Sequence, residues 1–557
     1  MQKAGLVVAV VLAAALSGCL QAFSGKHKEA PGAVKPAEVG YDPSQVAVNG
    51  FEKSMVTIPS FDSTPLSTII YAPTSSDTLP DGSPPRWGVV AFLHGWGDFK
   101  EMYEGAGGAT GAPAPADPSS QAPYSVNRLE AFARAGLIAV AYDARGFGQS
   151  GGMATVAGPA EMADLDAVLD YVAAHYPTNG LVGLVGQSYG GGEAYQAIAG
   201  DPRITTIAPF YGWVDLYQGL LPGNVPKAEW TALLLGIGEV GGKAQVSPMV
   251  YDWLQKASTR TDLETVHAQM DARSALGRLA AVPKPILVCQ GMQETLFPQA
   301  DLAWGQAAGF TRATIVTGGH GSDPPLCWSR ALDWMQYFVA GKDTKVDAWP
   351  ALTTVDASGL GEPLSYPTFP ASTAQTSYLR SGSPGALVGD PANTTFTIQQ
   401  SLVGNPLEEP SGLWDAAGQP NNQAPEQFRQ DPSGALFASP KSGGSEVLLG
   451  APVVHLHLAA APPAPPRFQV VAELFHVDAY GKSTLLSRGA HAVLSPADLA
   501  GGSLTVRLDW TKADLSPGDT LELKVGGNDQ AVYMPLPADY AVTFDGYSSI
   551  DLPYFSG

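Results

Sequence analysis

The sequence predicts an α/β domain built on a parallel sheet, followed by a β-sandwich or jelly-roll domain. In the first part of the chain, continuous apolar runs alternate with stretches of helical period, and after about Trp349 short β-rich segments separated by Gly, Pro and Asn take over. Continuous apolar strands joined through helices are typical of a parallel sheet covered on both faces, and closely spaced short strands are typical of a sandwich. A chain of 557 residues is also too long for a single core, which favours at least two packed units.

The elements of the first domain, residues 51–345, can be placed one by one. β-rich runs at 55–58 and 66–71 indicate a leading hairpin. Apolar strands are expected at 88–93, 137–142, 181–185, 204–208, 285–289 and 313–316, and helices at 126–135, 160–176, 191–198 and 327–339. Residues 211–279 interrupt this alternation with helical patterning and several large aromatic side chains, so they predict a cap over the carboxyl edge of the sheet. Residues 105–124 are rich in Gly, Ala, Pro and Ser and are expected to form an exposed loop.

The second domain, residues 346–557, contains almost no helical pattern. Its clearest β-rich segments lie at 395–398, 446–449, 453–458, 468–476, 504–508 and 521–525. Because turn residues separate these short segments, we expect a β-sandwich of the jelly-roll type.

The pattern of the N-terminal residues predicts an export segment. Lys3 supplies a positive charge, and the apolar stretch 6–16 is too short to span a bilayer. The stretch ends in Leu16-Ser17-Gly18-Cys19, which resembles the lipobox of bacterial lipoproteins, where cleavage leaves a lipidated cysteine. We therefore expect a signal peptide at 1–19, a flexible tether at 20–50, and an exported protein held in the bacterial cell envelope by lipid on Cys19; the alternative is an ordinary signal peptide with an incidental cysteine.

Charge and cysteine content exclude some classes of protein. A formal net charge of −21 without a basic stripe argues against a nucleic-acid partner, because a phosphate backbone would be repelled. With three cysteines, one of them at the lipobox, the chain is not a scaffold built on disulfides. Cys289 lies in an apolar strand and is expected to be an inert buried thiol, although a bridge to Cys327 stays open.

A candidate nucleophile lies in a G-x-S-x-G pattern. Both Ser188 and Ser150 fit the pattern, which is weak in a chain with 63 glycines. The motif needs a strand before it and a helix after it, so that a strained turn raises the hydroxyl above the sheet. Ser188 has that context, whereas Ser150 follows a turn and precedes glycines, so Ser188 is the predicted nucleophile of an α/β-hydrolase domain with a helical cap.

A serine hydroxyl also needs a base, and the base needs an acid. Of the nine histidines, His320 follows the last parallel strand, where the order nucleophile, acid, base places the histidine. Glu294 is the only carboxylate in the segment directly after strand 285–289, and is the predicted acid, with Asp301 and Asp143 as alternatives. Asp143 is expected instead to bond within its own Asp-x-Arg-Gly turn.

Two backbone N–H groups are predicted to stabilise the oxyanion. One belongs to Tyr189, which follows the nucleophile, and the other to Trp96 in the His94-Gly95-Trp96-Gly97 turn after the first parallel strand. No cofactor and no metal is expected.

The motifs together resemble a known family. They are His94-Gly95-Trp96-Gly97, Asp143-Ala144-Arg145-Gly146-Phe147-Gly148, Gly186-Gln187-Ser188-Tyr189-Gly190-Gly191, Gly291 to Pro298 with Glu294, and Gly318-Gly319-His320. In these stretches, and in the run from 473 to 490 of the second domain, the chain is similar to the X-Pro dipeptidyl-peptidase and cocaine-esterase-like (CocE/NonD) hydrolases from about Phe51 to its end. That family usually has Asp where this chain has Glu294, and its familiar members take one oxyanion donor from a tyrosine side chain where this chain suggests a backbone group.

The resemblance implies acyl transfer to water on a peptide or ester substrate. The expected activity is that of a serine hydrolase resembling X-Pro dipeptidyl-peptidases. The alternatives are a carboxylesterase of the cocaine-esterase type and a non-catalytic surface-binding lipoprotein, and the intact set Ser188, Glu294 and His320 argues against the last.

Overall fold

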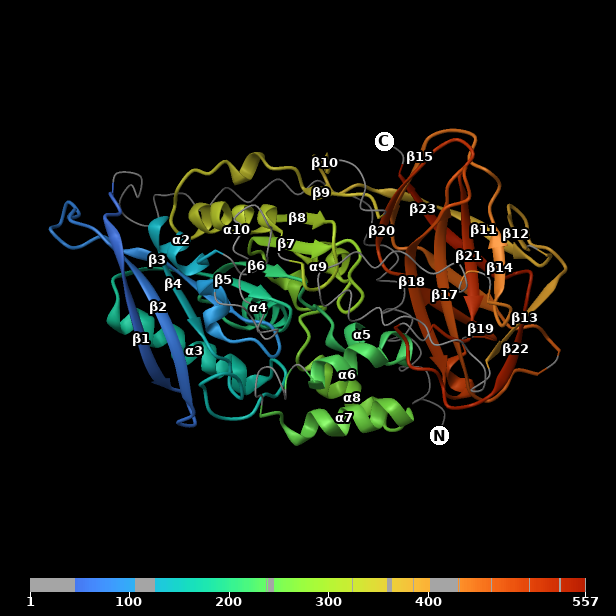
Figure 1. Ribbon diagram of the computed structural model, residues 1–557, viewed down its shortest axis with the longest axis horizontal. Coiled ribbons are helices and arrows are strands. Elements are labelled where there is room, and N and C mark those ends of the chain that lie inside the picture. The colour runs from blue at the N-terminus through green and yellow to red at the C-terminus, as the bar shows by residue number, and fades with distance from the viewer. Residues whose placement is uncertain are drawn as a thin grey trace, which may run out of the picture.

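The computed structural model describes residues 46–555 except 106–125, 237, 239–244, 323, 358–362, 384, 401–428, 430, 462, 500 and 530–531. The expected signal peptide with Cys19, most of the tether and most of the loop at 105–124 therefore lie outside the described residues. Figure 1 shows an α/β domain at the left and centre and a β-rich domain at the right. In the part of the chain that is described, no helix is long and apolar enough to cross a membrane.

The α/β domain is organised by a 10-stranded sheet in the order β1-β2-β4-β3-β5-β6-β7-β8-β9-β10. Neighbouring strands run parallel from β4 to β9, while the β1–β2 hairpin, the β2–β4 pair and the β9–β10 pair are antiparallel. The strands are β1 (Gly50–Pro59), β2 (Pro65–Thr74), β3 (Trp87–Leu93), β4 (Leu137–Tyr142), β5 (Thr178–Gln187), β6 (Ile204–Phe210), β7 (Ile286–Gly291), β8 (Thr311–Val316), β9 (Leu352–Thr354) and β10 (Leu364–Tyr366). The predicted hairpin and parallel strands are all present.

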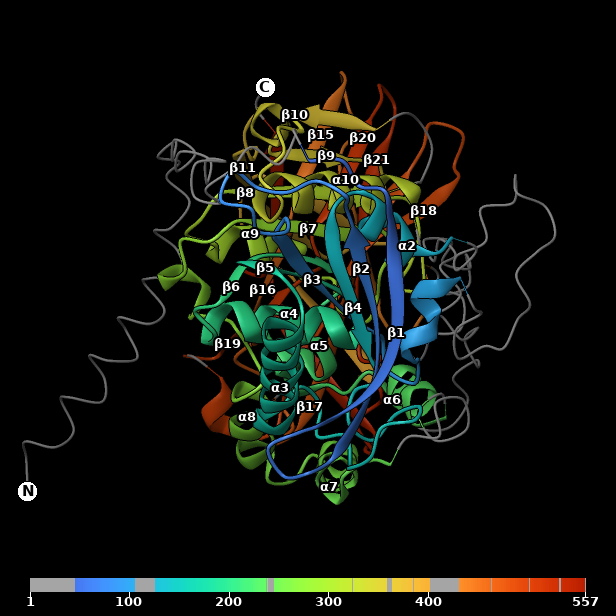
Figure 2. The ribbon, with the colours of Figure 1, turned by 90° about the vertical axis from the view of Figure 1, so that its left-hand side faces the viewer.

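The central strands are apolar throughout because both of their faces are covered. In β3, Val89 and Ala91 pack in a cluster with the helices α3 (Pro159–His175) and α4 (Tyr189–Gly200), and Val90 and Phe92 pack in a second cluster with α2 (Arg128–Arg134) and α10 (Pro325–Phe338). Figure 2 shows these two helix pairs on opposite sides of the sheet. A further helix, α9 (Ala300–Gln306), joins the cluster of α3 and α4.

The cap is inserted between β6 and β7, where helices interrupt the alternation of strand and helix. It contains α5 (Leu216–Leu220), α6 (Ala228–Gly236), α7 (Pro248–Thr259) and α8 (Leu263–Asp271), drawn in green below the sheet in Figure 1. Trp213, Trp230 and Trp253 are buried in its core, whereas Tyr251 is exposed. The cap thus covers the carboxyl ends of the parallel strands, as its sequence position predicts.

The C-terminal domain is a β-sandwich around one apolar core. An 11-stranded sheet folds over that core, and a two-stranded sheet of β13 and β22 completes it. The strands are β11 (Ser372–Arg380), β12 (Gly385–Val388), β13 (Thr395–Gln400), β14 (Ala435–Ala438), β15 (Glu446–Gly450), β16 (Val453–His457), β17 (Phe468–Val477), β18 (Ser483–Val493), β19 (Ser503–Arg507), β20 (Thr511–Leu515), β21 (Thr520–Gly526), β22 (Tyr540–Asp545) and β23 (Ser549–Phe555). Each of the six segments expected from sequence is a strand or overlaps one.

Two expected boundaries are wrong. The α/β domain does not end at 345, because β9 and β10 extend its sheet. Strands of three residues carry no readable periodicity, which is why the sequence assigned them to the second domain. The tether does not reach residue 50, because Val46 and Val48 pack on the core of the α/β domain and Asn49 pairs with Thr74.

Candidate active site

Ser188 stands at a sharp turn between β5 and α4. Its backbone has φ 53° and ψ −109°, a conformation that costs a serine free energy and projects its side chain away from the sheet. A Cβ on Gly186 would lie 2.0 Å from the carbonyl oxygen of Gly190, and a Cβ on Gly190 would lie 2.0 Å from that of Leu93. Both glycines of the motif are therefore required for the strand, the turn and the helix to pack this closely.

His320 lies between Ser188 and Glu294. Its Nε2 is 2.6 Å from Ser188 Oγ, and its Nδ1 is 2.6 Å from Glu294 Oε1. Because an ionised carboxylate can only accept, Nδ1 carries the proton and Nε2 is free to accept from the serine hydroxyl. The imidazole is held among aromatic rings, with the ring centres of Trp230 and Phe297 at 5.2 and 5.7 Å.

Glu294 is buried with no exposed side-chain surface. Its Oε1 accepts both from His320 Nδ1 and from the backbone N–H of Phe297, at 2.8 Å. Burial raises the pKa of Glu294 well above its usual range, and the Phe297 N–H and the charge of Lys227 act in the opposite direction. The side chain is thus held in place to orient the imidazole, but its charge needs support from its surroundings.

The alternative acids serve other purposes. Asp143 is fully buried and accepts from Lys100 Nζ at 2.9 Å and from the backbone N–H of Gln149 at 2.8 Å, which is the local bonding expected of its turn. Asp301 pairs with Arg507 of the β-sandwich. The carboxylate that pairs with His320 is that of Glu294.

Ser150, the second match to the nucleophile pattern, is a structural residue. Its hydroxyl donates to the carbonyl of Asp143 at 2.6 Å and accepts from the backbone N–H of Ser67 at 2.9 Å. Both bonds fix the turn after β4 against β2, and no histidine is bonded to this hydroxyl.

The loops that carry Glu294 and His320 are locked together backbone to backbone. A Cβ on Gly291 would lie 2.1 Å from the carbonyl oxygen of Gly318, so this contact requires glycine. Gln293 binds the histidine loop through its side chain, with its Oε1 accepting from the Gly318 N–H at 2.6 Å, while its Nε2 donates to Ala357 at 2.9 Å. Gln293 is a functional support that sequence reasoning missed, because a lone glutamine carries no recognisable signal.

A disulfide joins the strand before the acid loop to the helix after the histidine loop. Cys289 in β7 and Cys327 in the first turn of α10 are bonded, with Cα atoms 6.1 Å apart. The expectation that Cys289 is an inert free thiol is therefore wrong. The sequence could not decide this point, since the pairing depends on how α10 packs across the sheet.

The two predicted oxyanion donors lie next to the nucleophile. Tyr189 is the first residue of α4, where backbone N–H groups have no partner within the helix. The turn that carries Trp96 packs against the same helix end, because Gly190 N–H donates to the carbonyl of His94 at 3.0 Å. The Trp96 ring lies 5.5 Å from that of Tyr189, and its Nε1 donates to Leu234 of the cap at 2.8 Å. The use of these two N–H groups as oxyanion donors stays a prediction.

An apolar cavity of about 90 Å³ opens beside Ser188. Trp96, Val156, Trp213, Trp253 and Phe297 are among its walls, and none of the described residues that line it is charged. Within the described residues, no cluster of three or more His, Cys, Asp or Glu side chains could hold a metal ion. The site therefore combines a positioned nucleophile, base and acid with a binding space suited to apolar groups.

This fold and this arrangement of serine, histidine and glutamate define an α/β-hydrolase with a cap and an added β-sandwich. Residues 64–320 match the family model of the X-Pro dipeptidyl-peptidase (S15 family), and residues 342–549 match that of the X-Pro dipeptidyl-peptidase C-terminal non-catalytic domain. The chain belongs to this family of serine hydrolases and acts on peptide or ester bonds.

Solved structures share the whole fold at low sequence identity. A CocE/NonD family hydrolase from Staphylococcus aureus is 13% identical with a TM-score of 0.66, covering 95% of this chain and 99% of its own. An α-amino acid ester hydrolase is 14% identical with a TM-score of 0.67, covering 96% and 99%. An aminopeptidase from a marine sediment archaeon, Thaumarchaeota archaeon, is 14% identical with a TM-score of 0.65, covering 91% and 97%. No curated protein matches the chain significantly.

Proposed function

We propose that this hydrolase cleaves carboxylic esters whose acyl group is apolar and uncharged. The observation that carries the proposal is the cavity beside Ser188, whose described lining has aromatic and aliphatic side chains and no carboxylate. A dipeptidyl-peptidase must bind the free amine of its substrate, and burying an ammonium group without an anionic partner costs several kcal/mol. An uncharged acyl chain meets no such penalty and gains about 0.8 kcal/mol for each buried methylene.

The proposed reaction runs through an acyl-enzyme. Ser188 Oγ attacks the ester carbonyl carbon while His320 Nε2 takes its proton, and the N–H groups of Tyr189 and Trp96 donate to the developing oxyanion. His320 then gives the proton to the leaving alcohol. A water molecule, deprotonated by His320, attacks the acyl-enzyme, and His320 returns that proton to Ser188 Oγ as the bond to the acyl carbon breaks and the acid leaves. Glu294 stabilises the imidazolium in both halves of the reaction.

A panel of p-nitrophenyl esters of increasing acyl length, with aminoacyl-prolyl anilides beside them, tests the substrate class. We expect kcat/KM to rise with acyl length until the cavity is filled and to be far lower for the anilides. A preference for the anilides would overturn the ester proposal and favour the peptidase activity for which the family model is named.

We propose further that the mature protein is exported and held at a membrane surface by lipid on Cys19. The short apolar stretch and Leu16-Ser17-Gly18-Cys19 support this. The disulfide between Cys289 and Cys327 adds support, because disulfides persist mainly in oxidising compartments outside the cytosol. A diacyl anchor would suffice for stable attachment without a membrane-spanning helix.

A further inference from the structure

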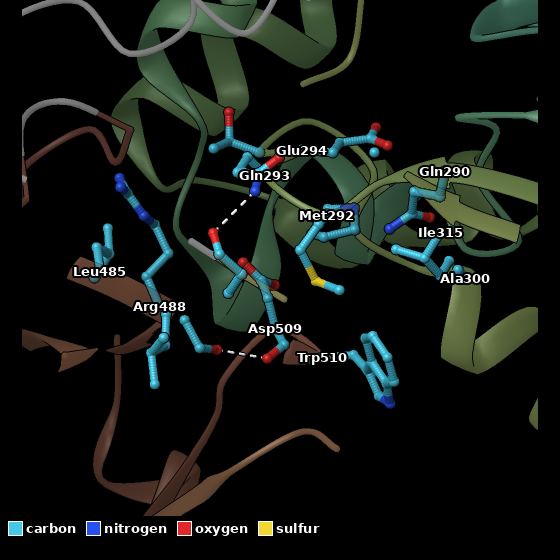
Figure 3. A pocket seen from close by; sticks show the side chains of 16 residues that line it. Gln290, Met292, Gln293, Glu294, Ala300, Ile315, Leu485, Arg488, Asp509 and Trp510 are labelled. Atoms are coloured by element: carbon cyan, nitrogen blue, oxygen red, sulfur yellow. Dashed lines mark hydrogen bonds between the residues drawn. The ribbon is translucent and has the colours of Figure 1, made fainter. Parts of the chain in front are cut away.

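Behind Glu294, a small cavity of about 40 Å³ separates the acid loop from the β-sandwich. Figure 3 shows Asp509 and Arg488 of the β-sandwich facing the loop of Gln293 and Glu294 across this space. Asp509 follows β19 and Arg488 lies in β18, so both come from the domain that contains no member of the catalytic set. A buried arginine and a half-buried aspartate of the second domain thus lie directly behind the catalytic acid.

Lys227 brings a third charge to this region from the cap, and this one is buried. The residue is 3% exposed, and its Nζ donates to the carbonyl of Leu296 at 2.7 Å, two residues beyond Glu294. The β-sandwich holds the segment in place, because Lys227 forms an antiparallel bridge with Tyr533 and Met534 N–H donates to Pro226 at 2.8 Å. The ammonium group is therefore fixed between the acid loop and the second domain.

A buried carboxylate in this position is favoured in its ionised form by a positive neighbour. Oε2 of Glu294 has no hydrogen-bond partner among the described residues, so Oε1 alone is stabilised by hydrogen bonds. Burial raises the pKa of Glu294, the charge of Lys227 lowers it, and the charge of Asp509 raises it. Burial raises the pKa of Asp509 itself to about 6, against the lowering effect of Lys227, Arg488 and Arg507, so Asp509 is largely ionised at neutral pH.

We propose that Lys227 is a positioning residue that keeps the carboxylate of Glu294 ionised, and that Asp509 of the β-sandwich opposes it. The second domain then sets the charge state of the acid, both by fixing the Lys227 segment and by supplying Asp509. The proposal rests on the function proposed above, in which Glu294 acts as a carboxylate on His320.

The test is the pH dependence of kcat/KM for a p-nitrophenyl ester in the full chain. Activity requires ionised Glu294 and neutral His320, so it falls as pH decreases through the apparent pKa values of this pair. The other charged groups around the pair are Lys227 from the cap and Asp509 and Arg488 from the β-sandwich. Beyond them, Asp301 of α9 and Arg507 act on Asp509. Changing Lys227 or Asp509 should therefore move the acid limb of the profile.

The two substitutions should move the limb in opposite directions. Lys227→Met removes the positive charge, raises the pKa of Glu294 and moves the limb to higher pH. Activity at a fixed acidic pH then falls about tenfold for each pH unit by which the limb moves, and it returns in alkaline buffer. Asp509→Asn removes the opposing charge and should move the limb to lower pH. Lys342→Met is the matched control, because Lys342 Nζ also donates to a backbone carbonyl, that of Ala135 at 2.7 Å, but on the far side of the α/β domain.

The outcomes separate this inference from the proposed function. Labelling of wild-type Ser188 by a fluorophosphonate, together with ester turnover, tests the function alone. If the wild type is active, two results overturn the inference. One is a pH profile of Lys227→Met that coincides with the profiles of wild type and Lys342→Met, and the other is a loss of kcat/KM by the same factor at every pH. Should Lys227→Met fail to fold, Asp509→Asn decides the question, and a limb that stays in place or moves to higher pH overturns it.

Discussion

Val156 is held in a backbone conformation that favours glycine, at the wall of the cavity beside Ser188. Its φ is 64° and that of Ala157 is 52°, and the left-handed region costs about 1–2 kcal/mol for a residue with a side chain. The loop is braced by Arg273, whose Nε donates to the carbonyl of Thr155 at 2.7 Å, and by the Tyr189 hydroxyl, which accepts from Ala157 N–H at 3.3 Å. Strain kept in place by such braces is typical of functional positions, and here it directs the Val156 side chain into the cavity wall.

The strain predicts an unusual order of stability for substitutions at this position. At an ordinary buried site, Val→Gly lowers the free energy of unfolding by about 1.5 kcal/mol more than Val→Ala does. Of this difference, ~0.8 kcal/mol comes from the one further carbon atom that glycine lacks and the rest from the higher chain entropy of glycine in the unfolded state. At Val156 only glycine releases the 1–2 kcal/mol of left-handed strain, which cancels that difference. We therefore expect Val156→Gly and Val156→Ala to unfold at the same denaturant midpoint. Val168, buried in the regular helix α3, is the control, and there glycine should be clearly less stable than alanine.

The same two variants should change the choice of substrate. Removal of the Val156 side chain deepens the cavity, so the optimum in a series of p-nitrophenyl esters should move to longer acyl chains, by about fourfold in kcat/KM for each methylene newly buried. Measured together, midpoints and kcat/KM test the argument twice. If the difference in denaturant midpoint between the glycine and alanine variants is the same at Val156 as at Val168, the strain argument is refuted. An unchanged acyl optimum would refute the placement of Val156 in the binding wall.

Four further predictions concern the catalytic set, the disulfide and the anchor. Ser188→Ala should lower kcat by about 10⁴- to 10⁶-fold and abolish fluorophosphonate labelling, whereas Ser150→Ala should keep both; labelling at Ser150 would contradict the assignment. Glu294→Gln should cost about 10⁴-fold in kcat with the fold intact, while Asp143→Asn should mainly lower stability, by about 1–3 kcal/mol, because buried Lys100 loses one of its two carboxylate partners and keeps Glu101; the reverse pattern in kinetics and denaturation would move the acid to Asp143. Replacing Cys289 and Cys327 by alanine should lower the unfolding free energy by about 2–4 kcal/mol in denaturant titrations, and detection of two free thiols in the unfolded, unreduced wild type would refute the bridge. Cys19→Ala should convert a detergent-extracted protein into a soluble or unprocessed one, and a freely soluble wild type with an N-terminus beyond Cys19 would exclude the lipid anchor.

The parts of the fold that sequence predicted are those encoded by local patterns. Strands such as β3 and β4 are apolar at every position because both faces are covered, and Ser188 is distinguished from Ser150 by the strand before it and the helix after it. Glu294 could be selected because it is the only carboxylate directly after its strand. In each case the deciding information lies within about one helix or strand of the residue.

The parts that sequence missed depend on contacts between distant segments. Lys227 and Asp509 are 282 residues apart in the sequence (509 − 227). They come close only because the cap, the acid loop and the β-sandwich pack together. The Cys289–Cys327 bond depends on how α10 crosses the sheet, and the strain at Val156 depends on the brace from Arg273. No periodicity or motif reports on such contacts, so a single sequence leaves them open.

The glutamate at the acid position shows how local geometry absorbs a departure from the family pattern. The acid and histidine loops lie in backbone contact, with Gln293 N–H donating to Gly318 at 3.1 Å, so the longer arm of glutamate would overshoot the imidazole if it were extended straight. Instead Glu294 turns back on its own loop, where Oε1 accepts from Phe297 N–H, three residues on, and still meets His320 Nδ1 at 2.6 Å. That position leaves Oε2 buried without a hydrogen bond among the described residues. Against the burial that raises the pKa of Glu294, the Phe297 N–H and then the fixed positive charge of Lys227 from the cap act to keep this singly bonded carboxylate ionised.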